Sequence, residues 1–227
     1  MKLIVSLCLI LLFTQLSFAQ DWANFNRYKD DNAKLGLPKP GEKRVVFMGN
    51  SITDAWINNC PEYFSENNYI DRGISGQTTP QMLVRFRADV INLKPVAVTI
   101  LAGTNDIAGN TGPSTLEMIA DNIYSMTELA RANGIKVILS SVLPAYAYPW
   151  KPGVEPAEKI AQLNEMIKAY ADSHGIVYLD YYTSMVDERK GLKKEYSEDG
   201  VHPNKAGYQV MMELCSKAIT KALKQKK

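Results

Sequence analysis

Three residue types that together can perform nucleophilic acyl transfer occur in this chain. Ser51 lies two residues after Gly49, at the end of an apolar run. Asp199 precedes His202 by three positions near the other end of the chain. A serine hydroxyl attacks a carbonyl group when a base takes its proton and a carboxylate orients that base. His202 could be the base and Asp199 its partner, provided that the fold brings both of them to Ser51.

Apolar runs of strand length alternate with longer helical patterns, and these elements must position the three residues. Short, nearly unbroken apolar runs are typical of a parallel sheet that is covered on both faces. Strands are expected at 45–48, 69–72, 96–101, 135–139 and 176–179, and helices at 79–93, 114–133, 156–174 and 203–227. The alternation predicts one α/β domain, a three-layer sandwich with a five-stranded parallel sheet. We expect a flavodoxin-like fold, in which the strand order is 2-1-3-4-5.

The ends of one expected helix have their own sequence signals. Ser114 and Glu117 have the spacing of a capping box, which predicts that the helix begins after Ser114. Asn133 followed by Gly134 is typical of a helix C-terminus.

The loops after the strands are the places where such folds bind ligands, at the carboxyl ends of the strands. Ser51 lies in the loop after the first run, and the loops 73–78 and 103–106 follow the second and third runs. The order 2-1-3-4-5 makes these three loops neighbours. His202 comes about twenty residues after the fifth run, and a connection of that length could carry it back to Ser51.

Four segments resemble, in their order and spacing, the four sequence blocks of the SGNH hydrolases, the superfamily that includes the GDSL esterases and lipases. They are 49–54, 73–78, 103–106 and 199–203. The first block of the family usually has Gly-Asp-Ser, and here Asn50 replaces the aspartate; a neutral asparagine can make the same local hydrogen bonds. The segment from Asn50 to Gln77 is most similar to short bacterial acylhydrolases that resemble the catalytic subunits of platelet-activating-factor acetylhydrolase.

The resemblance implies a role for each of five residues. Ser51 would be the nucleophile, His202 the general base and Asp199 the partner that orients the base. The backbone amides of Ser51 and Gly76 and the side chain of Asn105 would form the oxyanion hole. No metal ion and no organic cofactor is implied.

Each of these residues also has an ordinary structural interpretation. Ser51 could cap a helix N-terminus, Gly76 could serve a turn, and Asn105 could be a capping residue. A lone histidine such as His202 is most often structural. If the site were not catalytic, all of these structural interpretations would have to apply at once, at positions that follow the order of the family's sequence blocks. The sequence therefore favours a catalytic site.

An aromatic loop, 144–153, follows the fourth strand on the expected active-site side. Its rings Tyr146, Tyr148 and Trp150 are candidate substrate-binding residues that could stack on a sugar or line an acyl pocket. They could equally hold a proline-stiffened loop against its own domain.

These observations predict a serine esterase or acylhydrolase for short-chain esters, with acetyl groups on carbohydrate among the candidates. One alternative is a lysophospholipase or thioesterase, which would need a longer apolar groove than the sequence provides insertions to build. The other alternative is a non-catalytic carbohydrate-binding protein that uses the aromatic loop.

The composition limits the classes of partner. Of the 227 residues, 46% are hydrophobic and 22% are charged, and the formal net charge is +2. This balance gives no reason to expect nucleic acid or an anionic membrane as a partner. Two histidines also leave little room for a His-rich metal site. The expected partner is a small-molecule or oligosaccharide ester, and the oligomeric state stays open.

The first residues have the pattern of a secretory signal peptide that is cut after Ala19. Lys2 precedes a mostly apolar stretch, and small residues flank the expected cleavage site. The stretch is shorter than the roughly 20 residues that a membrane span needs. The expected organisation is therefore a signal peptide at 1–19, a polar lead-in at 20–40 and a hydrolase domain at 41–227.

Cleavage at this site predicts export to the periplasm or out of the cell. It would also leave two cysteines, Cys60 and Cys215, which we expect to be free and largely buried thiols.

Overall fold

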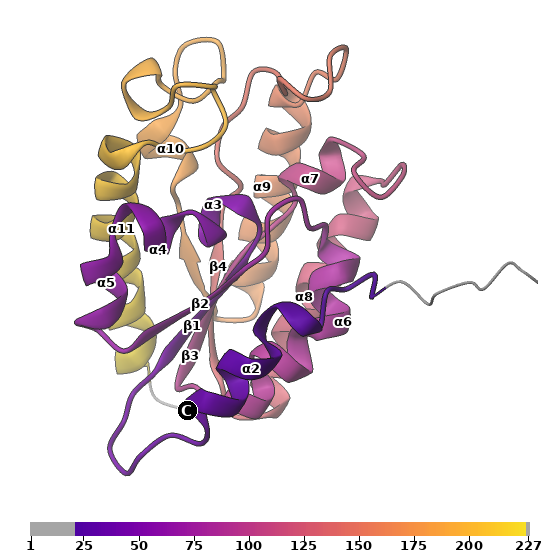
Figure 1. Cartoon of the computed structure of the whole chain (residues 1–227). Helices are drawn as coiled ribbons and strands as arrows, with labels where there is room; N and C mark the ends of the chain where they lie inside the picture. Colours follow the sequence, from indigo (N-terminus) through magenta and orange to yellow (C-terminus); the bar gives the residue numbers. More distant parts are fainter. Residues whose placement is uncertain (1–20, 226–227) are drawn as a thin grey trace, which may run out of the picture.

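Five parallel strands form the sheet at the centre of the molecule, and the computed structural model describes residues 21–225 (Figure 1). The strands are β1 (Val45–Gly49), β2 (Tyr69–Gly73), β3 (Ala97–Leu101), β4 (Lys136–Ser140) and β5 (Val177–Leu179). Their order in the sheet is β2-β1-β3-β4-β5, which confirms the predicted order. Strands β1 and β3 are neighbours although β2 lies between them in the sequence, so the direction of winding reverses there.

Strand β1 shows why this sheet needs helices on both faces. Its residues are all buried: Val46 and Met48 belong to one hydrophobic core, and Val45 and Phe47 belong to the other. Successive side chains of a strand point to opposite faces, so an apolar residue at every position buries both faces.

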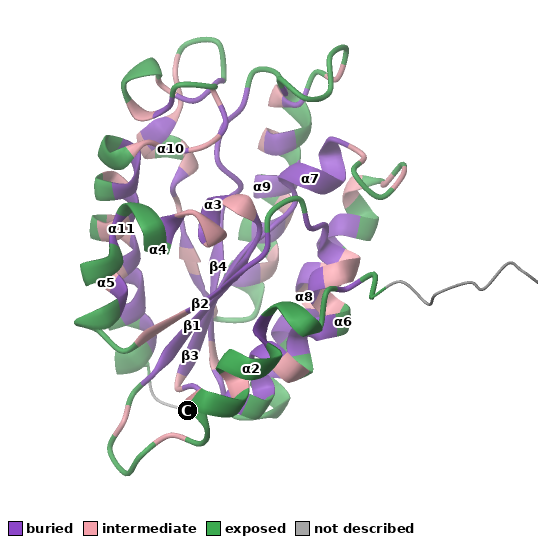
Figure 2. Cartoon of the chain, in the orientation of Figure 1, coloured by how far each residue is buried: buried purple, intermediate pink, exposed green. Residues whose placement is uncertain are grey.

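Two layers of helices cover the sheet (Figures 1 and 2). One core is closed by α6 (Thr79–Asp89), α8 (Leu116–Ala132) and α9 (Ala157–Ser173). The other is closed by α4 (Trp56–Asn59), α5 (Pro61–Ser65) and α11 (Lys205–Lys224). The predicted three-layer architecture is therefore confirmed.

The expected start of helix α8 was wrong by one residue. Thr115, and not Ser114, is the N-cap: its hydroxyl accepts a hydrogen bond of 3.2 Å from the amide of Met118. The helix ends as predicted, because Asn133 is the C-cap and Gly134 adopts a positive φ of 73°.

The polar lead-in contains a helix that the sequence pattern did not indicate. Helix α2 (Asn26–Leu35) lies beside the edge strand β2 and near α6 (Figure 1). Tyr28 is its one buried residue, so it lacks the apolar stripe from which amphipathic helices are recognised.

The expected signal peptide, 1–19, lies outside the described residues. Between residues 21 and 225, no helix combines the length and the apolar character that crossing a bilayer requires. Cys60 and Cys215 are free and buried, as expected.

Candidate active site

Ser51 is presented by a sharp turn from strand β1 into helix α3 (Ser51–Asp54). Asn50 caps this helix, because its side-chain oxygen accepts a hydrogen bond of 3.2 Å from the amide of Ile52. Asparagine at this position therefore makes the local hydrogen bond that the turn needs. Gly49 is required for close packing: a Cβ atom there would lie 1.9 Å from Oγ1 of Thr53.

The long connection after β5 brings a histidine back to this turn. It contains α10 (Tyr182–Met185) and the 3₁₀ helix η2 (Lys194–Tyr196), and it ends at the start of α11. The Nε2 atom of His202 lies 2.9 Å from Oγ of Ser51, and the Nδ1 atom lies 2.7 Å from Oδ2 of Asp199. The three side chains are in line, although Ser51 and His202 are 151 residues apart.

The environment of Asp199 keeps its carboxylate ionised. Burial alone would raise the pKa of Asp199, but hydrogen bonds from the His202 ring and from the amides of His202 and Val201 outweigh burial and lower the pKa to about 2. An ionised carboxylate accepts a hydrogen bond from the Nδ1–H group of the imidazole. The Nε2 lone pair is then left to face the hydroxyl of Ser51.

The two other loops lie beside Ser51. Gly76 has a φ of 79°, a conformation that favours glycine. Asn105 is buried in α7 (Thr104–Ile107), and its Nδ2 atom donates to the carbonyl of Gln77 over 2.9 Å. Within residues 21–225, the backbone amides of Ser51 and Gly76 have no protein acceptor. The three loops begin side by side, because Gly49 at the end of β1 pairs with Gly73 of β2 and with Leu101 of β3. Two backbone donors and one side-chain amide are therefore available in the loops at this edge of the sheet.

The aromatic loop approaches the histidine through Trp150. The centre of the Trp150 ring lies 5.9 Å from that of His202, and 41% of the residue is exposed. Tyr148 is only 2% exposed and stacks beneath Trp150, and its hydroxyl lies 2.8 Å from Oγ1 of Thr104. Tyr148 is therefore too buried to contact a ligand itself. Its role is to support the ring of Trp150, which is exposed.

Tyr146 lies further out on the same loop. It is 57% exposed and lies under the guanidinium of Arg189, at 5.4 Å from its ring centre. Both residues line a cavity of about 370 Å³ that also contacts Asp199. An exposed aromatic surface thus borders the histidine end of the site.

Reasoning from the sequence did not find the side chains that hold these loops together. Asp54 accepts hydrogen bonds from the amide and the hydroxyl of Ser75, over 3.1 and 2.7 Å. Asn110 donates to the carbonyl of Gly76 over 3.1 Å. Asp54 falls within the first resembling block, which was its only signal, and Asn110 had none.

A parallel five-stranded sheet with a serine, a histidine and an aspartate in line at its carboxyl edge defines an α/β acylhydrolase. The sequence profile of the GDSL-like lipase/acylhydrolase family matches residues 47–210, and the chain belongs to this family. It is a carboxylic ester hydrolase.

Similar proteins agree with this assignment. A candidate acylhydrolase from Bacteroides fragilis, known as a crystal structure, is 54% identical; the match covers 90% of this chain and 100% of that one, with a TM-score of 0.89. Esterase TesA from Pseudomonas aeruginosa is 26% identical over 182 residues, or 76% of this chain and 82% of the relative. An acetylxylan esterase from Xylanibacter ruminicola is 25% identical over 222 residues, or 82% of this chain and 45% of the relative.

Proposed function

We propose that this protein is a serine esterase that cleaves short-chain esters through an acyl-enzyme on Ser51. The observation that carries the proposal is the continuous hydrogen-bonded line from Ser51 through His202 to Asp199, with distances of 2.9 and 2.7 Å. Such a line is the arrangement that makes a serine hydroxyl nucleophilic.

The mechanism has two steps that use the same base. His202 takes the proton of Ser51 while Oγ attacks the ester carbonyl, and the oxyanion accepts hydrogen bonds from the amides of Ser51 and Gly76 and from Asn105. His202 then protonates the leaving alcohol as the C–O bond breaks. Water next attacks the acyl-enzyme and gives a proton to His202. His202 returns this proton to Oγ of Ser51 as the acyl–oxygen bond breaks, which releases the carboxylic acid and free Ser51. Side chains and water supply every proton in these steps, so the mechanism needs no cofactor.

We further propose that the acyl group is short, with acetyl as the best candidate, and that the alcohol is a carbohydrate. The leaving alcohol must lie next to His202, and the exposed rings of Trp150 and Tyr146 border that side of the site. Flat aromatic surfaces of this kind suit the apolar faces of sugars. The similarity to an acetylxylan esterase supports the same choice.

The experiment that tests the nucleophile is Ser51→Ala. The variant should lose hydrolysis of p-nitrophenyl acetate and labelling by a fluorophosphonate while keeping the melting temperature of the wild type. Retained turnover would overturn the assignment of Ser51. Glycan binding without acyl release by the wild type would instead identify a carbohydrate-binding protein.

Chain-length profiles test the substrate. Values of kcat/KM for p-nitrophenyl esters from acetyl to palmitoyl should be greatest at acetyl, whereas a maximum at long chains would identify a lipase or thioesterase. Tyr146→Ala should raise the KM for acetylated xylooligosaccharides and leave that for p-nitrophenyl acetate unchanged. Equal effects on both substrates would argue against a sugar at this surface.

Export is also a proposal, and it rests on the pattern of residues 1–19. An N-terminus at residue 20 in protein recovered from outside the cytoplasm would support it.

A further inference from the structure

The loop that carries Gly76 is held at almost every residue. This loop, residues 73–77, is here called the oxyanion loop. The amide of Gly73 donates to Oδ1 of Asp71 over 2.6 Å, and Asp54 binds Ser75 through its amide and hydroxyl. The next two carbonyls, of residues 76 and 77, accept hydrogen bonds from Asn110 and Asn105. The position of the Gly76 amide therefore depends on several neighbouring elements.

One of these neighbours is the segment 21–35, here called the N-terminal arm. The hydroxyl of Tyr28 donates a hydrogen bond to the carbonyl of Gly73, at the start of the oxyanion loop. At the other end of the loop, the side-chain amide of Gln77 donates to the carbonyl of Ala23 over 2.8 Å. The arm thus binds both ends of the oxyanion loop, although it lies outside the residues that match the family profile.

A third contact reaches the middle of the loop indirectly. Arg27 of the arm pairs with Oδ1 of Asp54 at 3.4 Å, and the other oxygen of this carboxylate holds Ser75. Gly73 also packs closely against the turn of Asp54, because a Cβ at Gly73 would lie 2.1 Å from the Asp54 amide. Movement of the arm would therefore shift Asp54, and through Asp54 it would shift the oxyanion loop at Gly73 and at Ser75.

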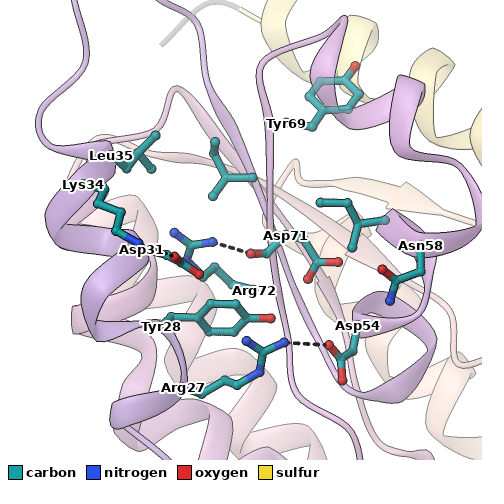
Figure 3. Close-up of a pocket in the computed structure, with 12 residues that line it drawn as sticks. Arg27, Tyr28, Asp31, Lys34, Leu35, Asp54, Asn58, Tyr69, Asp71 and Arg72 are labelled. Atoms are coloured by element: carbon teal, nitrogen blue, oxygen red, sulfur yellow. Dashed lines mark hydrogen bonds and ion pairs between the residues drawn. The ribbon is translucent and has the colours of Figure 1, made fainter.

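The Tyr28 side chain is well fixed for this purpose (Figure 3). The residue is 5% exposed, and its ring lies between the guanidinium groups of Arg27 and Arg72, at 4.7 and 4.6 Å from the ring centre. Burial raises the pKa of the Tyr28 hydroxyl, so the group stays protonated and able to donate.

The location of β2 explains why this donor matters. Strand β2 is the edge of the sheet, so the carbonyl of Gly73 has no strand partner on its outer side. The Tyr28 hydroxyl fills that place by donating directly to this carbonyl. Tyr28 also lines a cavity of about 540 Å³ between α2 and the edge strand (Figure 3). Tyr28 is the one buried residue of α2. The helix is also fixed to β2 and α6 through Asn32, which accepts from Arg72 over 2.8 Å and donates to Asp89 over 2.7 Å. These bonds hold the helix in place, and the Tyr28 hydroxyl is its direct contact with the oxyanion loop.

We propose that the N-terminal arm is a positioning element for the oxyanion loop and that Tyr28 is its positioning residue. The proposal rests on the proposed role of the Gly76 amide in stabilising the oxyanion. Misplacement of a catalytic group by about 1 Å can cost on the order of 10²-fold in rate, so a partly released loop should lower turnover without weakening substrate binding.

The test is Tyr28→Phe, which removes the hydroxyl and keeps the ring between the two arginines. Tyr124→Phe is a matched control, because its hydroxyl also donates to a backbone carbonyl, that of Met166, but joins α8 to α9. For p-nitrophenyl acetate we expect kcat of Tyr28→Phe to fall roughly 5- to 20-fold, with KM within about twofold of the wild type. The rate of fluorophosphonate labelling should fall in parallel. Both variants should lose similar amounts of thermal stability.

A second pair of variants covers the case in which Tyr28→Phe does not fold. Arg27→Gln removes the ion pair with Asp54 from an exposed position, and Lys34→Gln removes the exposed pair with Asp31 on the same helix. Arg27→Gln should lower kcat about two- to fourfold, and Lys34→Gln should leave it unchanged.

The outcomes separate the two proposals. If Ser51→Ala is inactive while Tyr28→Phe and Arg27→Gln keep the kcat of their controls, the arm has no positioning role and the proposed mechanism stands. If Ser51→Ala remains active, the proposed function fails, and the role of the arm fails with it.

Discussion

Asp199 accepts four hydrogen bonds, and three of them come from its own turn. Its Oδ1 atom binds the hydroxyl of Ser197 and the amides of Val201 and His202, over 3.1, 2.9 and 2.8 Å. The other oxygen is left for the imidazole. The turn therefore orients the carboxylate independently of its bond to the imidazole. The spacing Asp-x-x-His makes this possible, because it lets the side chain of the aspartate accept from backbone amides two and three residues later.

Replacement of Asp199 by asparagine tests this arrangement. In Asp199→Asn the side-chain oxygen can still accept from the turn, and the NH₂ group then faces Nδ1 of His202. The ring must accept at Nδ1 and carry its proton on Nε2, where it cannot take the proton of Ser51. We expect kcat for p-nitrophenyl acetate to fall on the order of 10³- to 10⁴-fold with little change in melting temperature.

The exposed residue Asp172 provides the control for this variant. Asp172→Asn should keep full activity. A loss of less than about tenfold in Asp199→Asn would mean that the carboxylate does not set the tautomer of the base.

At the scale of elements, helix α11 fixes the distance between the two ends of the catalytic line. Asn204, two residues after His202, caps this helix: its side chain accepts from the amides of Ala206 and Gly207. One turn further on, the buried hydroxyl of Tyr208 donates to the carbonyl of Ile52 over 2.8 Å. Helix α11 is thereby tied to helix α3, which begins with Ser51.

Tyr208→Phe should loosen this tie. Loss of one buried hydrogen bond costs about 1 kcal/mol of the free energy of unfolding. Because the bond joins the elements that carry His202 and Ser51, we also expect kcat to fall about three- to tenfold. Urea unfolding and steady-state kinetics would measure the two effects. A stability loss with unchanged kcat would show that α11 supports the core and does not set the geometry of the site.

In the molecule as a whole, the fold buries two carboxyl groups, of Asp71 and Asp106, whose hydrogen bonds do not fully offset the cost of burying a negative charge. Burial, only partly offset by the hydrogen bond from Gly73, raises the pKa of Asp71 from 3.8 to about 7. Its Oδ2 atom is buried and has no hydrogen-bond partner within residues 21–225. Burial likewise raises the pKa of Asp106 to about 6, against hydrogen bonds from Thr79. The folded protein therefore holds these protons at a pH where the unfolded chain has released them.

The sign of the pH dependence follows from linkage. For an acid whose pKa is raised by folding, stability is greatest below the pKa of the unfolded chain, near 4, and is lost as the pH rises to the folded value, near 7 for Asp71. Asp71→Asn cannot ionise, so between pH 5 and pH 8 its melting temperature should fall less than that of the wild type. The expected difference is roughly 2–3 kcal/mol, or about 4–12 °C.

Differential scanning calorimetry at the two pH values would measure this difference, with Asp172→Asn as the surface control. Parallel curves for Asp71→Asn and the wild type would mean that Asp71 is already ionised in the folded protein at pH 5.

Local patterns in the sequence were enough to predict the architecture. Apolar runs specify strands, and β1 had to be covered on both faces because each of its residues is apolar or a glycine. The three-layer fold and the end of α8 at Asn133 follow from such short-range signals. The order of the sheet was expected from the flavodoxin-like fold type, and the structure confirms it. The start of α8 was misplaced because Ser114 and Thr115 can both cap, and only the path of the chain decides between them.

Tertiary structure decided which distant groups meet. Nothing near Tyr28 in the sequence indicates a contact with Gly73, 45 residues away, and the helix α2 around it is strongly polar, with a single buried residue. The partners of Gly76 and Ser75 are single side chains: Asn110, from a loop, and Asp54, from helix α3. The sequence determined which residues could do chemistry, because that depends on side-chain type. Only the packing of the elements decided what holds them in place, because a hydrogen bond depends on distances that no local pattern encodes.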